Sequence, residues 1–449
     1  MDITVASHQI KNARLEAISS KSFVHRELIA AALSGGKWLV GTNIFSEDMK
    51  ATAECLRAMG AKILTNAEGF LVDAPVKEGK SVTLNCKESG STARFLLPVA
   101  ACLYDEVSLT GEGRLPERPF GPLCEALRDK GVEVSGDHLP IQTRGKLTAG
   151  EYRLPGNVSS QYVTGLLLAL PLLKGPSGLL LTTELSSKEY VDITLRVLSD
   201  HGVRIGQEKD RYLIPGNGYS GGSFNDTGDK DRAFGGIAGE EDRIFRAAEG
   251  DWSNGGYLLC MGAIKGEITL EGLSAGSVQG DRAVLRVLED FGAAVRTGPE
   301  TSVKAGELHG IDLDAENIPD LVPALAVVAA FAEGNTVFRN VGRLRIKESD
   351  RIEQTGKLLW ALGVRTKVSG EGNGTSLTVF GEGGKLRTTQ GEVTVDSGND
   401  HRIAMAAAIA AFGSSLRIRI RGAEAVNKSY PGFFSMCRDV LGMEIREVI

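Results

Sequence analysis

Two kinds of apolar segment alternate along the chain, and the first kind occurs six times. Each copy has a small or polar cluster, an apolar run of helix length rich in Ala and Leu, a Gly, and then a short β-like stretch. Because these runs are apolar nearly all round, they predict helices that are buried on every side. The copies are SKSFVHRELIAAALSGG (20–36), ESGSTARFLLPVAACLYD (88–105), GNVSSQYVTGLLLALPLLKG (156–175), GDWSNGGYLLCMGAIKG (250–266), IPDLVPALAVVAAFAEG (318–334) and SGNDHRIAMAAAIAAFG (397–413).

The second kind of segment is amphipathic and lies between these copies. Its apolar residues fall at i, i+3, i+4 and i+7, and a Gly then leads into β-branched residues. This pattern predicts a helix with one buried face, a left-handed cap and a following strand. The five examples are DMKATAECLRAMGAKI (48–63), PFGPLCEALRDKGVEV (119–134), YVDITLRVLSDHGVRI (190–205), DRAVLRVLEDFGAAV (281–295) and ESDRIEQTGKLLWALGVRT (348–366).

The spacing of the copies indicates six structural repeats. Their starts are roughly 70 to 90 residues apart, which is too long for a solenoid unit and suits two helices with several strands. Three such repeats can bury their apolar helices together, so we expect two domains of three repeats each. The break is expected in residues 216–243, which are rich in Gly and Asp and have no apolar period.

Composition is that of a globular protein, with 42% hydrophobic and 24% charged residues among 449. The net charge of −6 argues against nucleic acid as a partner, because such proteins usually have a basic excess, so any anion site must be local. The six cysteines form no CxxC pair, which predicts free thiols and no metal. Without a signal-like start or an apolar run of ~18 residues, we expect a cytoplasmic protein that does not contact membranes.

The polar residues at the six helix starts are the candidate chemistry. A helix start has unpaired N–H groups and the positive end of the macrodipole, so it favours an anion. Asp251, Ser253 and Asp400, taken singly, are ordinary helix N-caps. Basic residues in a first turn oppose the dipole unless an anion offsets them, which predicts an anion site. These basic residues are Lys21, Arg26, Arg94 and Arg402.

Further basic residues lie in three other stretches. Arg114 lies in GRLPERPF, Lys428 lies in VNKSYPGFF, and RLRIKESDR contains Lys347, Glu348 and Arg351. Lys347 and Arg351 are expected to share a helical face at i and i+4, with Glu348 able to bridge to Arg351. No Walker A motif occurs, and the GNGYSG at 216–221 is not followed by a helix, so we do not expect a dinucleotide loop.

Taken together, these stretches resemble the 5-enolpyruvylshikimate-3-phosphate synthase family over essentially the whole chain. The resemblance rests on SKSxxxR (20–26), SGSTxR (89–94), RLPERPFG (114–121), SSQ (159–161), SKxYxDIT (187–194), EGDxS (249–253), IPD (318–320), RIKESDR (345–351), NDHRIAM (399–405) and NKSYPGFF (427–434). It implies an α/β fold, the two-domain inside-out α/β barrel, in which each domain has three β-α-β-α-β-β repeats with buried helices. One domain would be 19–247, the other 1–18 with 248–449, and the cleft between them would be the active site of a monomer.

The resemblance also implies a site and a reaction. The enolpyruvyl group of phosphoenolpyruvate would pass to the 5-hydroxyl of shikimate 3-phosphate, and phosphate would leave a tetrahedral intermediate, with no cofactor and no metal. Asp320 would be the general base, and Lys21 or Glu348 would protonate the enolpyruvyl carbon. Phosphoenolpyruvate would be held by Lys21, Gly90, Arg114, Gln161, Arg351, Arg402 and Lys428. Shikimate 3-phosphate would be held by Lys21, Ser22, Arg26, Ser159, Ser160, Gln161, Ser187, Tyr190, Asp320 and Lys347.

Two other functions are considered. A sister enzyme transfers enolpyruvyl to UDP-N-acetylglucosamine, but it usually has a reactive cysteine in the loop that here reads GEGRLPERPF and has none. A non-catalytic anion-binding repeat protein could have lost Lys21 or Asp320, and both are present. Glu88, Phe95 and Arg343 depart from residues that many or some relatives have, which puts inhibitor sensitivity in doubt rather than the reaction.

Overall fold

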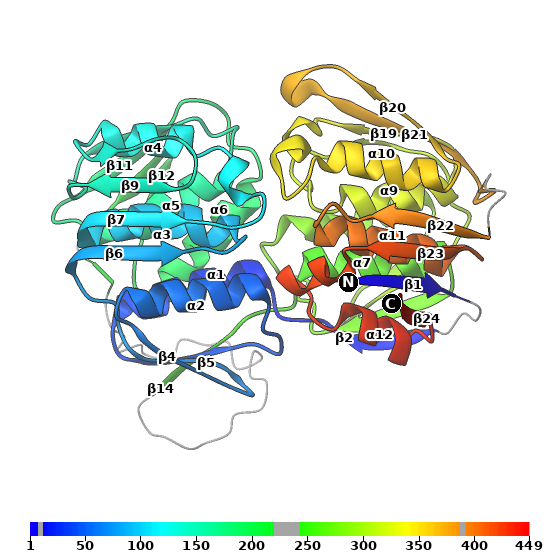
Figure 1. Cartoon of the computed structure of the whole chain (residues 1–449), viewed down its shortest axis with the longest axis horizontal. Coiled ribbons are helices and arrows are strands. Elements are labelled where there is room, and N and C mark those ends of the chain that lie inside the picture. Colours follow the sequence, from blue (N-terminus) through cyan, green and yellow to red (C-terminus); the bar gives the residue numbers. More distant parts are fainter. Residues whose placement is uncertain (8–11, 217, 220–242, 387–390, 449) are drawn as a thin grey trace. The chain divides into compact units, whose positions relative to one another are not determined.

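The chain forms two compact units in the computed structural model, which describes residues 1–7, 12–216, 218–219, 243–386 and 391–448 (Figure 1). Unit 1 is Met1–Ile18 with Gly250–Ile449, and unit 2 is Ser19–Glu249. Residues 216–243, where the break between domains was expected, lie mostly outside the described residues. The division falls a few residues later, because the strand β14 (Arg243–Ala247) still pairs with β3 (Lys37–Gly41) of unit 2.

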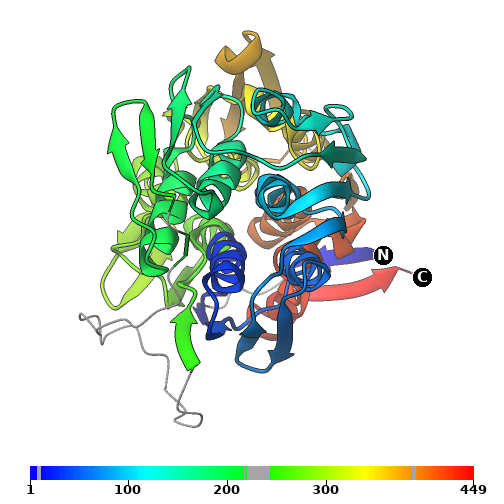
Figure 2. The same ribbon diagram turned by 90° about the vertical axis from the view of Figure 1, so that its left-hand side faces the viewer.

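Unit 2 has three four-stranded sheets, with orders β14-β3-β5-β4, β6-β7-β9-β8 and β10-β11-β13-β12. Figure 2 views this unit nearly along its helices, with the strands around them. The helices are α1 (Lys21–Ser34), α2 (Glu47–Ala58), α3 (Gly90–Leu103), α4 (Gly121–Arg128), α5 (Ser160–Ala169) and α6 (Lys188–Asp200). The other strands are β4 (Lys62–Asn66), β5 (Gly69–Ala74), β6 (Gly79–Asn85), β7 (Tyr104–Thr110), β8 (Glu133–Val134), β9 (Ile141–Arg144), β10 (Glu151–Leu154), β11 (Ser177–Leu181), β12 (Gly206–Glu208) and β13 (Arg211–Ile214).

Unit 1 also has three four-stranded sheets, with orders β22-β23-β1-β24, β16-β17-β15-β2 and β18-β19-β21-β20. Its helices are α7 (Trp252–Ile264), α8 (Val284–Phe291), α9 (Val322–Phe331), α10 (Arg351–Ala361), α11 (His401–Gly413) and α12 (Phe433–Asp439). Its strands are β1 (Asp2–Ala6), β2 (Ala13–Glu16), β15 (Glu267–Glu271), β16 (Ala294–Arg296), β17 (Glu300–Lys304), β18 (Asp312–Asp314), β19 (Glu333–Arg339), β20 (Arg365–Ser369), β21 (Ser376–Glu382), β22 (Glu392–Asp396), β23 (Arg417–Arg421) and β24 (Glu444–Val448).

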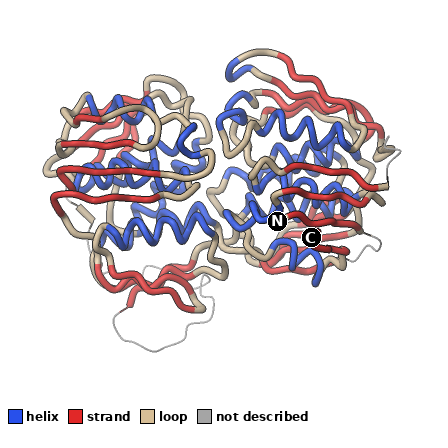
Figure 3. Tube along the Cα trace, in the orientation of Figure 1, coloured by secondary structure: helices blue, strands red, loops and turns tan. Residues whose placement is uncertain are grey.

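The two kinds of helix differ in burial as their sequences predicted. In α11, twelve of thirteen residues are buried, whereas α8 buries Val284, Val287, Leu288 and Phe291, which recur at i, i+3, i+4 and i+7. The apolar helices α7, α9 and α11 contact one another inside unit 1. Figure 3 shows the sheets of each unit as the layer outside its inner helices. None of the described helices has the length and apolar character to span a membrane.

Two repeats exchange their first strands. In the other four repeats, the strand before the buried helix pairs in parallel with the strand after it, as β6 does with β7 across α3. The strand β2 precedes α1 but pairs with β15, whereas β14 precedes α7 but pairs with β3. The chain therefore enters unit 2 between Ile18 and Ser19 and returns between Glu249 and Gly250. Each crossing lies just before a buried helix that starts with polar residues.

Close helix packing explains one glycine of the apolar segments. A Cβ at Gly165 of α5 would lie 2.3 Å from the carbonyl oxygen of Arg94 in α3, so a side chain there would push the two helices apart. This contact fixes the start of α3 against the start of α5. Both starts have polar residues singled out by the sequence.

Candidate active site

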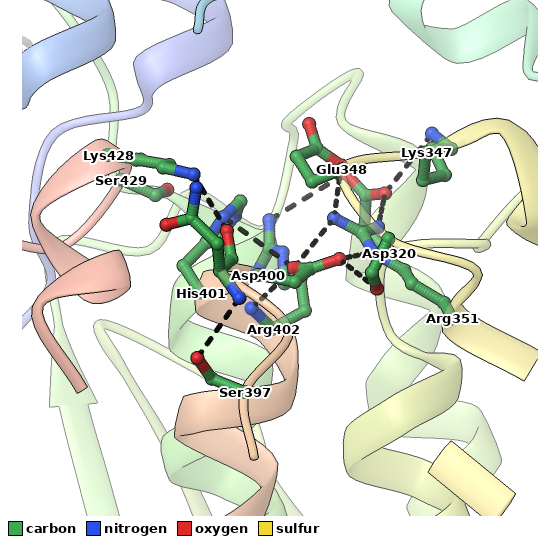
Figure 4. Close-up of polar contacts among 12 residues, drawn as sticks. Asp320, Lys347, Glu348, Arg351, Ser397, Asp400, His401, Arg402, Lys428 and Ser429 are labelled. Carbon is green, nitrogen blue, oxygen red and sulfur yellow. Dashed lines mark hydrogen bonds and ion pairs between the residues drawn. The ribbon is translucent and has the colours of Figure 1, made fainter. Parts of the chain in front are cut away.

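Arg351 is the centre of the charged cluster in unit 1. It is the first residue of α10 and only 1% exposed. Its Nη1 donates to Asp320 Oδ1 at 2.7 Å, its Nη2 to Glu348 Oε2 at 2.7 Å, and its Nε to Asp400 Oδ2 at 2.8 Å (Figure 4). Burial opposes the charge of Arg351, but these carboxylates outweigh it and raise its pKa well above the ordinary value. The arginine is therefore a cation held by three carboxylates.

The starts of α7, α9 and α11 meet at Arg402. Its Nη1 donates to the carbonyl oxygen of Ser253 at 3.2 Å, and its Nη2 lies 3.7 Å from Asp320 Oδ2. The guanidinium lies over the ring of Tyr257, 5.1 Å from the centroid. Asp400 is the N-cap of α11 and accepts from the Arg402 backbone N–H at 2.9 Å. The ordinary N-cap that the sequence indicated at Asp400 is therefore present, and the same side chain also binds Arg351.

Asp320 lies just before α9 and contacts three cations. Lys347 Nζ donates to it at 3.3 Å, in addition to the contacts with Arg351 and Arg402. Burial alone would raise the pKa of Asp320, but Lys347, Arg351 and Arg402 together hold that pKa well below its usual range. With these contacts, Asp320 is an ion-pair partner and a weak base.

Lys347 and Arg351 meet for a different reason than the one expected. The helix α10 begins at Arg351, and Lys347 follows the short 3-10 helix Gly342–Ile346, so the two do not share a helical face. Both instead reach the same oxygen, Oδ1 of Asp320. The expected bridge between Glu348 and Arg351 is present. Lys428 belongs to another part of unit 1 and donates to the carbonyl oxygen of Asn399 at 2.7 Å, one residue before Asp400.

In unit 2, a second cluster surrounds the start of α3. Arg94 Nη1 donates to Gln161 Oε1 at 3.1 Å, and Gln161 Nε2 donates to Ser91 Oγ at 3.0 Å. Arg94 lies over the ring of Phe120, 4.7 Å from its centroid. A Cβ added to Gly90 would lie 2.6 Å from Arg94 Nη1. Glycine at position 90 thus allows a guanidinium group to lie directly against the helix start.

The loop 114–121 presents a different arginine from the one that was expected. Arg114 is exposed and pairs with Glu117 at 3.2 Å, whereas Arg118 is buried with its Nη1 2.7 Å from the Cβ position of Gly90. The 3-10 helix Leu115–Glu117 explains the difference, because residues three apart lie on one side of such a helix. Arg118 lies three residues after the buried Leu115 and therefore on the same side, whereas Arg114 and Glu117 lie together on the exposed side. The structure therefore does not bring Arg114 to the cluster, and the residue that was missed is Arg118.

Arg26 is buried within unit 2, and its hydrogen-bond partners are neutral groups. It donates to Thr194 Oγ1 at 2.8 Å, Thr164 Oγ1 at 3.3 Å, and the carbonyl oxygens of Ser22 at 2.7 Å and Tyr190 at 3.0 Å. These contacts use four of the five N–H groups of a guanidinium. Burial lowers the pKa of Arg26 to about 9, which leaves it charged at neutral pH. Arg26 therefore fixes the backbone of two residues that were expected at the site.

The remaining expected residues of unit 2 lie at three helix starts. Lys21 begins α1 and its Nζ donates to Asp48 Oδ2 at 2.8 Å. Ser159 is the N-cap of α5 and accepts from the Gln161 N–H at 3.3 Å, and Ser160 is buried beside it. Ser187, before α6, has φ 54°, a left-handed conformation that is unusual for serine and typical of functional sites.

Comparisons with known proteins give the family of the chain. The family model of EPSP synthase (3-phosphoshikimate 1-carboxyvinyltransferase) matches residues 7–235 and 236–436. A 3-phosphoshikimate 1-carboxyvinyltransferase of Clostridium novyi (strain NT) is 36% identical over 446 residues, covering 96% of each chain. The enzyme of that name from Clostridium kluyveri is 38% identical over 434 residues, covering 95% of this chain and 94% of the relative.

Solved structures share the fold. The EPSP synthase of Acinetobacter baumannii superimposes with a TM-score of 0.74 at 24% identity, covering 100% of both chains. The enolpyruvyl transferase NikO of Streptomyces tendae has a TM-score of 0.75 at 18% identity, covering 99% of this chain and 98% of its own. These likenesses confirm the predicted inside-out α/β fold. With the family model and the curated relatives spanning nearly the whole chain, the protein belongs to the EPSP synthase (3-phosphoshikimate 1-carboxyvinyltransferase) family.

Proposed function

We propose that the charged clusters of the two units form one active site. In this site the anionic groups of the substrates bind the cations that contact Asp320 and thereby weaken those contacts. The chain is an enolpyruvyl transferase that moves the enolpyruvyl group of phosphoenolpyruvate to the 5-hydroxyl of shikimate 3-phosphate and releases phosphate. The observation that carries the proposal is the contact of Asp320 with Lys347, Arg351 and Arg402. A general base needs a pKa near the working pH, and these three contacts hold the pKa of Asp320 well below its usual range.

Binding of the substrates changes these contacts. The phosphate and carboxylate of phosphoenolpyruvate bind Arg351, Arg402 and Lys428, and shikimate 3-phosphate binds Lys347. Each anion draws a cation away from Asp320 and adds negative charge near it, and both effects raise the pKa of a carboxyl group. Asp320 then accepts the proton of the 5-hydroxyl as that oxygen attacks C2 of phosphoenolpyruvate. The base is thus weak until both substrates are present.

Unit 2 supplies hydrogen-bond donors and cations from helix starts that the fold holds in place. Phosphoenolpyruvate is held by Lys21, Gly90 and Gln161, and by Arg118 in place of Arg114. Shikimate 3-phosphate is held by Lys21, Ser22, Arg26, Ser159, Ser160, Gln161, Ser187 and Tyr190. Arg26 contributes charge and fixes the carbonyl groups of Ser22 and Tyr190.

The remaining steps use the same groups. Lys21 and Glu348 are the candidate donors of the proton that C3 of the enolpyruvyl group gains on addition. The tetrahedral intermediate then loses phosphate from C2 and a proton from C3, so that the C2–C3 double bond forms again. The group that donated the C3 proton, now deprotonated, takes a proton back, and Arg351, Arg402 and Arg118 stabilise the charge that develops on the leaving phosphate. Exclusion of water from the closed site strengthens each of these interactions.

Phosphate release tests the proposal. Mixed with phosphoenolpyruvate and shikimate 3-phosphate, the protein is expected to release inorganic phosphate, and omission of either substrate should abolish release. Absence of turnover with this pair, together with turnover on UDP-N-acetylglucosamine, would assign the chain to the sister reaction instead. Binding of both substrates without turnover would indicate a non-catalytic anion-binding protein.

A further inference from the structure

A buried polar stretch, Ser277–Asp281, covers the first turn of α7 and has no part in the reaction described above. Gln279 Oε1 accepts from the Trp252 N–H at 3.1 Å, and its Nε2 donates to the carbonyl oxygen of Gly250 at 2.8 Å. Asp281, in the 3-10 helix η4 (Gly280–Ala283), is 2% exposed. Burial of polar groups in an otherwise apolar interior is costly. Such a stretch therefore calls for an explanation other than core packing.

Ser253 connects Asp281 to the anion-binding cluster. The hydroxyl of Ser253 donates to Asp281 Oδ2, and the carbonyl oxygen of the same residue accepts from Arg402 Nη1 at 3.2 Å. Ser253 thus links Asp281 to Arg402, because its hydroxyl group bonds one and its carbonyl oxygen bonds the other.

Charged groups reach Asp281 from three helices. Asp320, before α9, and Asp251, the N-cap of α7, oppose its ionisation, whereas Arg402 of α11 favours it. Arg282 of η4 and Arg286, Glu289 and Asp290 of α8 are exposed. Burial is the largest influence and, with Asp320, raises the pKa of Asp281 to about 7. The charge of this side chain therefore changes in the neutral range.

We propose that Asp281 is a positioning residue for Arg402: its carboxyl group holds Ser253, and its negative charge, when present, competes with phosphoenolpyruvate for the Arg402 guanidinium. The proposal rests on the function proposed for Arg402. Protonated Asp281 keeps the hydrogen bond to Ser253 but leaves Arg402 more available to an anion. Phosphoenolpyruvate is therefore bound more tightly below neutral pH than above it.

The pH dependence of the KM for phosphoenolpyruvate tests this role. Asp281→Asn keeps the shape and removes the charge, so we measure phosphate release by both proteins from pH 6 to pH 9 at saturating shikimate 3-phosphate. The ratio of the wild-type KM to the variant KM is expected to rise about tenfold as the pH passes 7, which is the size of effect that one nearby charge can produce. Ionisation of the substrate phosphates affects both proteins equally and cancels in the ratio. A ratio that does not change with pH would overturn the proposal.

Two further variants make the test independent of how well Asp281→Asn folds. Ser253→Ala removes the hydrogen bond that lowers the pKa of Asp281, so the midpoint in the KM profile should move to higher pH, and an unmoved midpoint would contradict the proposal. Asp290→Asn makes the same charge change at an exposed position of α8. The ratio of the wild-type KM to the KM of this variant should stay near one at every pH. A pH-dependent ratio would show that the effect does not depend on the position of Asp281 and would contradict the proposal.

Unfolding in urea gives a readout that needs no turnover. Between the unfolded pKa near 3.8 and the folded pKa of about 7, the folded wild type keeps a proton that the unfolded chain has lost. The stability of the wild type relative to Asp281→Asn should therefore fall as the pH rises from about 4 to about 7 and then stay constant. A flat difference would contradict the inference. Absence of wild-type turnover would instead count against the proposed function.

Discussion

Arg351 of unit 1 and Arg26 of unit 2 are the two most deeply buried arginines among the described residues, and they are stabilised in opposite ways. Arg351 of unit 1 contacts the carboxylates of Asp320, Glu348 and Asp400. Arg26 of unit 2 contacts hydroxyl and carbonyl oxygens, and no ion pair of Arg26 with an acidic side chain occurs among the described residues. The carboxylates raise the pKa of Arg351, whereas burial lowers that of Arg26.

This difference indicates different roles for the two arginines. A carboxylate beside Arg351 can be replaced by the phosphate or carboxylate of a substrate, because the incoming group makes the same kind of charged hydrogen bond. The hydroxyl and carbonyl partners of Arg26 are parts of the fold and cannot be exchanged in that way. Under the proposed function, Arg351 of unit 1 exchanges a partner with the substrate, whereas Arg26 of unit 2 keeps its partners.

The largest effect is expected when the exchangeable arginine is removed. Arg351→Met leaves the buried Asp400 and the partly exposed Asp320 and Glu348 without their common partner, which should lower the free energy of unfolding by about 3–5 kcal/mol. Urea denaturation measures the change. The control Arg296→Met removes an arginine that is 75% exposed and should change stability by less than about 0.5 kcal/mol. Equal losses for the two variants would show that the carboxylates do not depend on Arg351.

Removal of Asp320 separates turnover from binding. Asp320→Ala should turn over at least ~100-fold more slowly, as loss of a general base does. It should bind phosphoenolpyruvate at least as tightly as the wild type, because Lys347, Arg351 and Arg402 lose a competing carboxylate. Steady-state kinetics and calorimetry measure the two quantities, and Asp312→Ala, at a 59% exposed position, is the control. Unchanged turnover would remove Asp320 from the role of base.

The loop of unit 2 offers a comparison between two arginines four residues apart. Arg118→Ala should raise the KM for phosphoenolpyruvate by roughly 10- to 100-fold, because it removes a charged donor of about 1.5–3 kcal/mol. Arg114→Ala should leave the KM within about twofold, since it breaks only an exposed pair with Glu117. The reverse order of effects would restore Arg114 to the site.

The smallest effect is expected at Gly90. In Gly90→Ala the added methyl group meets the ends of Arg94 and Arg118 at 2.6 and 2.7 Å, so both guanidinium groups must shift. The KM for phosphoenolpyruvate should rise about tenfold, the loss of roughly one misplaced hydrogen bond, while the fold tolerates the change. Gly136→Ala is the control, because a Cβ there meets nothing within 4 Å. Equal KM values for the two variants would show that Arg94 and Arg118 can move away from the methyl group without loss of substrate binding.

Much of the fold could be predicted because apolar period and burial are directly linked. The helices α7, α9 and α11 are apolar all round and buried all round. The helix α12 was missed because it has only seven residues, too few for a clear period. The exchange of β2 and β14 between sheets has no signal in local sequence, because each pairs with a strand that lies far away along the chain.

The site was predictable where a residue type breaks a local rule. Of the four basic residues expected in a first helical turn, Lys21 and Arg402 lie there, and both contact carboxylates. Arg26 and Arg94 instead lie in the second turn, as the sixth residue of α1 and the fifth residue of α3. Sequence could not decide between Arg114 and Arg118, because that choice depends on which side of a three-residue helix faces the interior. The contacts of Asp320 with three cations were equally hidden, since they join segments that lie tens of residues apart in the chain.

The pKa of Asp320 tests the exchange of partners most directly. With carboxyl-labelled aspartate, the ¹³C signal that disappears in Asp320→Asn can be followed during a pH titration. The free protein should show a pKa well below the usual range, and shikimate 3-phosphate with an unreactive phosphoenolpyruvate analogue should raise it toward neutrality. A pKa that stays low, or falls further, in the presence of both ligands would contradict the account.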